Sequence, residues 1–339
     1  MIPRTDAIWQ SKTDQNNNWQ AQLKAVIRQP EELFARLSLN TLDMPAHLAA
    51  HRDFALRVPE HFVSKMEPSN WQDPLLLQVL PQAQELAKQP GFISDPLHEA
   101  QSNPKPGLIH KYQGRVLLIA SGGCAINCRY CFRRHFPYQE NNPSREEWRQ
   151  TLKYIASNDS IHEVILSGGD PLINTDQQLK ALITDIANID HIKTLRIHSR
   201  LPLVIPQRIT EDFIDVFCNN RLKQVFVAHC NHPNELDINT EEAFLHLKKA
   251  GVTLLNQSVL LANINDDFEV LAGLSKRLFE QGVLPYYLHL LDPVNGAAHF
   301  DVSELRGKAL IEQLRNYLPG YLVPKLVREV AGIPSKTPI

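Results

Sequence analysis

Three cysteines lie close together in the segment GGCAINCRYCFRRHF, residues 122–136. Cys124, Cys128 and Cys131 have C-x₃-C-x₂-C spacing in a chain with only five cysteines. Thiolates at this density are typical ligands of metal ions or iron–sulfur clusters. Structural zinc prefers four closed ligands, usually from two paired C-x₂-C motifs, and no second pair exists here. A zinc-stabilised binding scaffold would need a fourth ligand from elsewhere, such as His135, Cys218 or Cys230.

The same spacing fits a [4Fe–4S] cluster with three protein ligands. Four cysteines would complete the coordination of such a cluster, whereas three leave one iron open to a small molecule. C-x₃-C-x₂-C with an aromatic residue, Tyr130, before the last cysteine resembles the signature of the radical S-adenosylmethionine (SAM) enzymes. That resemblance implies that the open iron binds SAM and that one electron cleaves SAM to a 5′-deoxyadenosyl radical.

The composition excludes several other classes of protein. The 339 residues carry 35 Lys and Arg against 37 Asp and Glu, a net charge of −2, which argues against a polyanion binder. No secretory signal and no apolar run of about 18 residues is visible. An odd number of cysteines suits a reducing compartment better than a disulfide framework. We therefore expect a cytoplasmic protein with no nucleic-acid or membrane partner.

Apolar runs of strand length recur from Val116 onward, with helical patterns between them. The runs are VLLIAS (116–121), EVILSGG (163–169), TLRIHS (194–199), QVFVAH (224–229), TLLNQSVLL (253–261) and YYLHLLD (286–292). Capping signatures predict helix starts: Ser144 precedes Glu147, Thr175 precedes Gln178, and Thr240 and Ser303 precede acidic first turns. Apolar strands that alternate with helices predict a parallel sheet covered on both faces. Six such units predict an α/β fold, an incomplete TIM-type (β/α)6 barrel, with a doubly wound open sheet as the alternative.

Polar residues at the strand ends favour the barrel. A barrel brings the C-terminal ends of its strands to one centre, and such ends carry Cys124, Gly168–Asp170, His198–Arg200, His229, Gln257 and Asp292. Residues 1–108 show helical patterns interrupted by prolines, and SNPKPGLIHKY, from Ser102, has the composition of a connector. We expect an N-terminal helical region (1–108), a radical SAM partial barrel (109–320) and a C-terminal segment (321–339).

Further motifs resemble the lysine 2,3-aminomutase family across nearly all of residues 96–338. The matching strings are GLIHKYQGRVLL (107–118), CRYCFRRHF (128–136), SGGDPL (167–172), RIHSRLPLVIPQRIT (196–210), HCNHPNE (229–235), LLNQSVLL (254–261) and GIPSKTP (332–338). Members of that family use pyridoxal 5′-phosphate (PLP) with SAM, because a radical 1,2 amino shift needs a π bond to bridge through. The resemblance implies conversion of L-α-lysine, held as a PLP aldimine, to (R)-β-lysine.

The resemblance also assigns cofactor roles. Lys336 would form the resting Schiff base with PLP, although its segment has one glycine, Gly332, where the family often has several. Without the resemblance, a lysine so near the end of the chain would be interpreted as a solvated tail. Tyr112 and Arg115 match positions near the PLP phosphate, for which arginine is a bidentate donor. The residues implied to contact SAM are Ser167, Gly168, Gly169, Asp170, His229 and Gln257.

The implied substrate residues are charged. Arg133 matches the family arginine that binds the substrate carboxylate, and Asp292 and Glu329 match the two acids that hold the ε-ammonium. The family usually has Asp at the second of these positions. Two acids in one pocket favour a cationic side chain, since a buried ammonium needs a paired charge. L-Lysine is therefore the expected substrate, and a radical SAM and PLP aminomutase for another amino acid is the alternative.

The family context suggests partners. Longer, catabolic members continue past the PLP lysine into a cysteine-bearing tail, whereas this chain has three residues after Lys336. It thus resembles the short bacterial aminomutases that supply (R)-β-lysine for modification of elongation factor P. The resemblance further implies a reductase or flavodoxin-type electron donor and is compatible with an oligomer.

Overall fold

A curved sheet forms the centre of the computed structural model, which describes residues 18–40, 44–141 and 144–339. Strands that follow one another in sequence are neighbours in space, from β1 to β9. β2 to β8 pair in parallel, whereas β1 (Leu108–Tyr112) and β9 (Thr337–Pro338) pair antiparallel at the two edges. The parallel strands are β2 (Arg115–Ser121), β3 (Glu163–Gly168), β4 (Thr194–Ser199), β5 (Lys223–Ala228), β6 (Thr253–Val259), β7 (Leu284–His289) and β8 (Lys325–Arg328).

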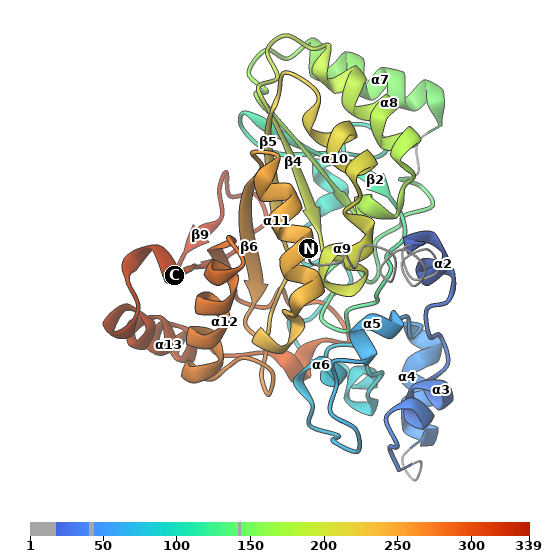
Figure 1. The fold of residues 1–339 in the computed structure, drawn as a ribbon, viewed down its shortest axis with the longest axis vertical. Coiled ribbons are helices and arrows are strands. Elements are labelled where there is room, and N and C mark those ends of the chain that lie inside the picture. Colours follow the sequence, from blue (N-terminus) through green and yellow to red (C-terminus); the bar gives the residue numbers. More distant parts are fainter. Residues whose placement is uncertain (1–17, 41–43, 142–143) are drawn as a thin grey trace, which may run out of the picture.

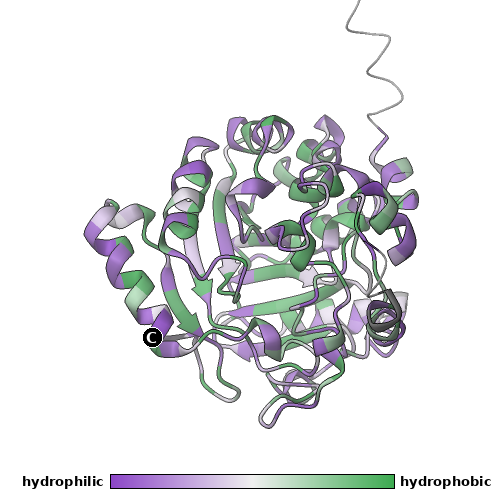
Figure 2. Ribbon diagram, turned by 90° about the horizontal axis from the view of Figure 1, so that it is seen from below, coloured by the Kyte–Doolittle hydropathy of each residue, from purple (hydrophilic) through white to green (hydrophobic). Residues whose placement is uncertain are grey.

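This order confirms the predicted incomplete barrel, since the two edge strands are not paired with each other in the described residues. The six predicted strands correspond to β2–β7. Helices connect the parallel strands and cover the outer face of the sheet (Figure 1), and Figure 2 shows the apolar strands inside an arc of helices. The main connecting helices are α7 (Arg145–Ala156), α8 (Asp176–Ala187), α10 (Glu211–Cys218), α11 (Ile238–Lys249), α12 (Phe268–Glu280) and α13 (Glu304–Tyr317).

Helix starts follow the predicted caps with one exception. Ser144 and Thr175 cap α7 and α8, each in a reciprocal capping box, and Ser303 caps α13. The prediction from Thr240 was wrong by three residues. Asp237 is the N-cap of α11, and its Oδ1 accepts from the backbone N of Thr240 at 2.9 Å. The Thr240 hydroxyl is instead the reciprocal member of this capping box, because it accepts from the backbone N of Asp237 at 2.8 Å.

The N-terminal helices pack onto the barrel rather than forming a separate core. They are α2 (Trp19–Lys24), α3 (Pro30–Arg36), α4 (Met44–Asp53), α5 (Glu60–Val63) and α6 (Pro74–Leu77). One buried cluster joins Phe34, Phe62 and Leu75 of these helices to Leu118 and Val164 of β2 and β3. None of the helices in the described ranges is long and apolar enough to cross a membrane.

Two segments form strands that the sequence did not predict. The second half of the expected connector from Ser102 is β1, which pairs with β2. The expected C-terminal segment contributes β8 and β9 to the same sheet. Strand β8 is only four residues long, KLVR, so its apolar signal is weak in the sequence. Its pairing with β7 and β9 brings the end of the chain back to the inside of the barrel.

Candidate active site

The cysteine loop leaves the C-terminal end of β2 and is pinned by the glycine-rich loop that follows β3. Gly169 N donates to Ser121 O at 2.8 Å, and Asp170 N donates to Gly123 O at 2.7 Å. A Cβ atom on Gly169 would lie 2.1 Å from Gly123 O, and one on Gly168 would lie 2.6 Å from Ser121 O. Glycines are therefore required here because the two backbones touch. The loop that carries Cys124 depends on this contact for its position.

The side chain of Asp170 joins two loops of the protein. Its buried carboxylate accepts from Ser199 Oγ at 2.7 and 2.9 Å and from the backbone N–H groups of Leu172, Arg200 and Leu201. Burial raises the pKa of Asp170, although these donors oppose the shift. With its oxygens occupied by protein donors, the side chain ties the end of β3 to the end of β4. Its contact with SAM stays a prediction.

The cysteine donors fit an iron–sulfur cluster. Cys124, Cys128 and Cys131 are free thiols, each partly buried on the one loop. Burial and the neighbouring sulfurs raise the pKa of Cys124 well above its usual range and that of Cys131 to about 11. A cluster would bind them as thiolates and release protons. Among the described residues, no three His, Cys, Asp or Glu side chains surround a single ion position. Cluster cysteines each bind a separate iron and do not need to converge on one point.

A cavity of about 260 Å³ lies inside the curved sheet. It is lined by residues of β1–β4, β6 and β7, by His229 directly after β5, and by residues of the C-terminal segment. It brings together most of the predicted cofactor and substrate residues: Tyr112, Arg115, Arg133, Ser167, His229, Gln257, Asp292, Glu329 and Lys336. The cavity lining does not include Gly168, Gly169, Asp170 or the three cysteines. One pocket thus contains groups from distant parts of the chain, which is typical of an active site.

Lys336 reaches this cavity because β9 folds back on β8. Arg328 pairs with Thr337 in the antiparallel register, so Glu329 and Lys336 face each other across the turn. Lys336 Nζ lies 3.2 Å from Glu329 Oε2 and 3.3 Å from His289 Nε2. Burial lowers the pKa of Lys336, although Glu329 and Asp292 oppose the shift. A lysine with a lowered pKa is more often the neutral amine that Schiff-base chemistry requires.

The two acids predicted to bind the substrate ammonium, Asp292 and Glu329, differ in pKa. Burial and the charge of Glu329 raise the pKa of Asp292 to about 7. Burial alone would raise the pKa of Glu329, but Lys336 and Lys111 outweigh it and lower that pKa to about 2. Within the described part of the chain, the buried Asp292 Oδ1 has no hydrogen-bond partner. An unpartnered acid beside an ionised one is suited to a cationic ligand.

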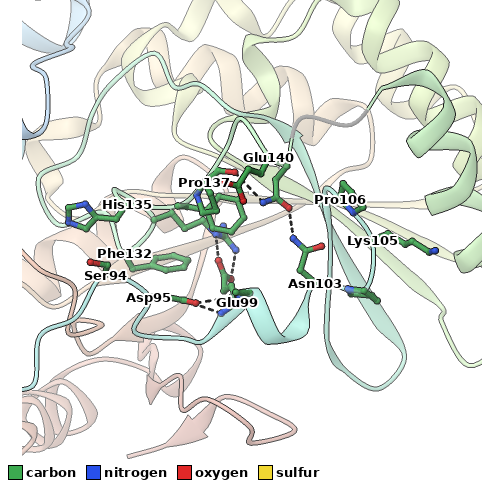
Figure 3. Close-up of a pocket in the computed structure, with 15 residues that line it drawn as sticks. Ser94, Asp95, Glu99, Asn103, Lys105, Pro106, Phe132, His135, Pro137 and Glu140 are labelled. Carbon is green, nitrogen blue, oxygen red and sulfur yellow. Dashed lines mark hydrogen bonds and ion pairs between the residues drawn. The ribbon is translucent and has the colours of Figure 1, made fainter.

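Glu99 is a cavity residue that the sequence did not reveal. Arg133 donates to it from Nε at 2.7 Å and from Nη2 at 2.8 Å, and Lys111 donates at 3.0 Å. Lys111 also donates to Glu329 at 2.9 Å. Figure 3 shows Glu99 reaching from the short helix η2 (Glu99–Ser102) toward the cysteine loop, within a neighbouring cavity of about 350 Å³. Arg133, the residue predicted to bind the substrate carboxylate, is therefore held by two hydrogen bonds to Glu99, which lies 34 residues away in the sequence.

Two further cavity residues, His198 and His289, carry a partial sequence signal. His198 lies two residues after Arg196 on β4, and His289 two residues after Tyr287 on β7. Residues two apart on a strand face the same side, and all four line the cavity. Burial lowers the pKa of His198 and of His289 well below the usual range, so both are neutral near pH 7.

His229 and Gln257 lie together, as their matching strand ends require. Gln257 Nε2 lies 3.0 Å from His229 Nε2, and the rings of His229 and His198 meet edge to face with centroids 5.5 Å apart. Burial lowers the pKa of His229 to about 3, so this histidine is neutral near pH 7 and offers hydrogen bonds rather than charge. The pair is available to orient a polar ligand at the open end of the strands.

Comparison with known proteins gives close relatives. The sequence pattern of the Radical SAM superfamily matches residues 118–273. An L-lysine 2,3-aminomutase of Haemophilus influenzae is 50% identical over 95% of this chain and 96% of its own length. One of Escherichia coli is 49% identical over 96% of each chain, and one of Clostridium subterminale is 34% identical over 100% of this chain and 82% of its own. These similarities favour a radical enzyme over a zinc-stabilised scaffold.

Proposed function

Because this chain belongs to the lysine 2,3-aminomutase family of radical SAM enzymes, we propose that it moves the α-amino group of L-lysine to C3 and releases (R)-β-lysine. It is an isomerase, and its cofactors are a [4Fe–4S] cluster, SAM and PLP, as in that family. The observation that carries the lysine assignment is the cavity in which Arg133, Asp292, Glu329 and Lys336 meet.

When bound, the cluster and SAM supply a radical, and PLP supplies the π system through which nitrogen migrates. Cys124, Cys128 and Cys131 would hold the cluster at the rim of the barrel. His229 and Gln257, 3.0 Å apart, would orient SAM with Ser167, which lines the same cavity.

PLP would occupy the cavity between Lys336 and Arg115. The guanidinium of Arg115 lies 4.3 Å from the centre of the Tyr112 ring, and both residues line the cavity. An arginine held against an aromatic face keeps its planar donors free for a phosphate. At the other end, Lys336 presents an amine whose pKa burial lowers. His289, neutral and 3.3 Å away, can accept a hydrogen bond from that amine and so orient it.

Substrate lysine would be held at both ends. Arg133 uses Nε and Nη2 for Glu99, which leaves Nη1 and the second N–H of Nη2 for the substrate carboxylate. Asp292 and Glu329 would hold the ε-ammonium. The arriving cation favours the ionised form of Asp292, whose pKa of about 7 would then fall. Substrate binding thus gives Asp292 a partner of opposite charge.

Anaerobic reconstitution tests the proposal directly. Full-length protein loaded with iron, sulfide and PLP is given SAM, a reductant and L-lysine, and the product is resolved by chiral chromatography. (R)-β-Lysine is expected. Preferred turnover of arginine, ornithine or glutamate would establish the aminomutase of another amino acid. Zinc without inorganic sulfide in the purified protein would contradict the radical mechanism.

We further propose that the product serves the modification of elongation factor P, with electrons supplied by a reductase or flavodoxin-type donor. The support is the higher identity to the Haemophilus influenzae and Escherichia coli relatives, 50% and 49%, than to the clostridial one, 34%. The test is the mass of elongation factor P from a host that lacks its own aminomutase, with and without this gene. An unchanged mass would refute this role and leave the proposed reaction standing.

A further inference from the structure

Arg200 lies directly after β4, and its buried guanidinium donates to the cysteine loop. Nη1 donates to Cys128 Sγ at 2.8 Å and to Tyr130 Oη at 2.8 Å. Nη2 donates to Gln78 Oε1 at 2.6 Å and to Glu235 Oε2 at 2.9 Å. The residue is only 4% exposed. A charged donor therefore reaches a predicted cluster ligand from the barrel side, in a place shielded from water.

Both the backbone and the guanidinium of Arg200 are held in place by neighbouring residues. Its backbone N–H donates to Asp170 Oδ2 at 2.9 Å, and Asp170 belongs to the loop that pins the cysteine loop. Its guanidinium lies 5.1 Å from the centre of the Phe62 ring. Glu235, which pairs with Arg200, also accepts from the backbone N–H groups of Asn231 and His232. Such a side chain is already oriented before any cofactor binds.

Neutral side chains complete the hydrogen-bond network that surrounds Arg200 and the Cys128 sulfur. Asn231 Nδ2 donates to Gln78 Oε1 at 3.1 Å and to Tyr130 Oη at 2.7 Å. Gln78 directly follows the N-terminal helix α6, so this region of the chain contributes to the surroundings of the cysteines. Arg200 and Glu235 balance each other as a buried pair. A thiolate at Cys128 would add one negative charge beside the guanidinium, which already donates to its sulfur.

We propose that Arg200 is a positioning residue that raises the reduction potential of the cluster through its hydrogen bond to the Cys128 sulfur. The inference rests on the proposed function, because it requires a cluster on these cysteines. One-electron reduction by an external reductant adds a negative charge to the cluster and its thiolates. A fixed cation with an N–H donor on sulfur stabilises the reduced state more than the oxidised state. Arg200 thereby makes reduction of the cluster by the external donor more favourable.

The test compares wild type with Arg200→Gln and Arg200→Lys, each as full-length protein reconstituted anaerobically. Iron and sulfide per chain are measured, and the midpoint potential is obtained from a redox titration followed by the paramagnetic signal of the reduced cluster. In Arg200→Gln we expect the equilibrium constant for reduction to fall roughly tenfold or more, about 59 mV for a one-electron couple. Arg200→Lys keeps the charge but loses the planar fork, so an intermediate shift is expected.

Arg208→Lys is the matched control. Arg208 is as deeply buried as Arg200, but its guanidinium binds Leu172 O, Asn174 O and Asp176. The proposal predicts an unchanged potential in this variant. A wild-type potential in both Arg200 variants would overturn it, as would an equal shift in Arg208→Lys. If Arg200→Gln does not fold, the Arg200→Lys potential decides alone. Failure of wild type to take up iron and sulfide would instead refute the proposed function.

Discussion

Glu99 binds Arg133 through two parallel hydrogen bonds, 2.7 and 2.8 Å long, before any substrate is present. The same carboxylate receives Lys111, and Lys111 and Lys336 both bind Glu329. A continuous chain of alternating charges therefore runs from the predicted carboxylate end of the substrate site to the predicted PLP lysine. Changing one member leaves its neighbours buried without a partner, which makes the site sensitive to single substitutions.

Glu99→Gln is expected to lower kcat/KM for lysine roughly tenfold, because the fork that orients Arg133 is lost. Breaking a buried pair on one side also destabilises the fold by about 3 kcal/mol. Steady-state kinetics and thermal unfolding measure the two effects. Glu146→Gln, which removes an exposed partner of Arg149, is the control and should change neither quantity. Wild-type kcat/KM in Glu99→Gln would show that Arg133 needs no such support.

Lys336→Ala is expected to abolish the yellow imine absorbance of PLP-loaded protein. Among the described residues, Lys111 and Lys336 are the two lysines that line the cavity, and Lys111 forms ion pairs with two carboxylates. Borohydride reduction followed by peptide mass spectrometry locates the pyridoxyl group. Lys308→Ala, at an exposed lysine paired with Glu304, should retain full labelling. A reducible PLP adduct at wild-type level in Lys336→Ala would disprove the assignment.

The KM for lysine should rise as the pH falls below about 7. The pKa of Asp292 is raised to about 7 by burial and by Glu329, so the carboxyl is neutral below this pH and ionised above it. The ionised form binds the ε-ammonium. Glu329, with a pKa of about 2, stays ionised throughout and contributes no pH dependence in this range.

Asp292→Asn should remove that pH dependence and raise KM roughly thirtyfold, equivalent to about 2 kcal/mol for a charged hydrogen bond. Initial rates from pH 6 to 9 give both results. Asp301→Asn is a suitable control because Asp301 does not line the cavity. A pH dependence of KM that survives in Asp292→Asn would assign it to another group.

Gly169→Ala should reduce cluster content and stability together. Its Cβ atom would meet Gly123 O at 2.1 Å, so the glycine-rich loop must withdraw from the cysteine loop. Overpacking of this kind costs about 2 kcal/mol. Iron and sulfide analysis and thermal unfolding test the prediction. Gly320→Ala, where no atom lies within 4 Å of the added carbon, should behave as wild type.

The sequence alone determined the parts of this protein that depend on local pattern. The spacing of Cys124, Cys128 and Cys131 predicts three ligands on one loop. Apolar runs predicted β2–β7, and hydroxyl caps predicted the starts of α7, α8 and α13. These signals are local because a strand, a cap or a ligand loop is encoded within a few consecutive residues.

Only the tertiary structure decided which distant groups are partners. The fork between Glu99 and Arg133 joins residues 34 apart, and the link from Lys111 to Glu329 spans 218. Asp170 matched a cofactor motif in the sequence, and only the fold shows that its carboxylate accepts from Ser199, Arg200 and Leu201. The pairing of buried charges depends on burial and distance in three dimensions, and a linear pattern contains neither.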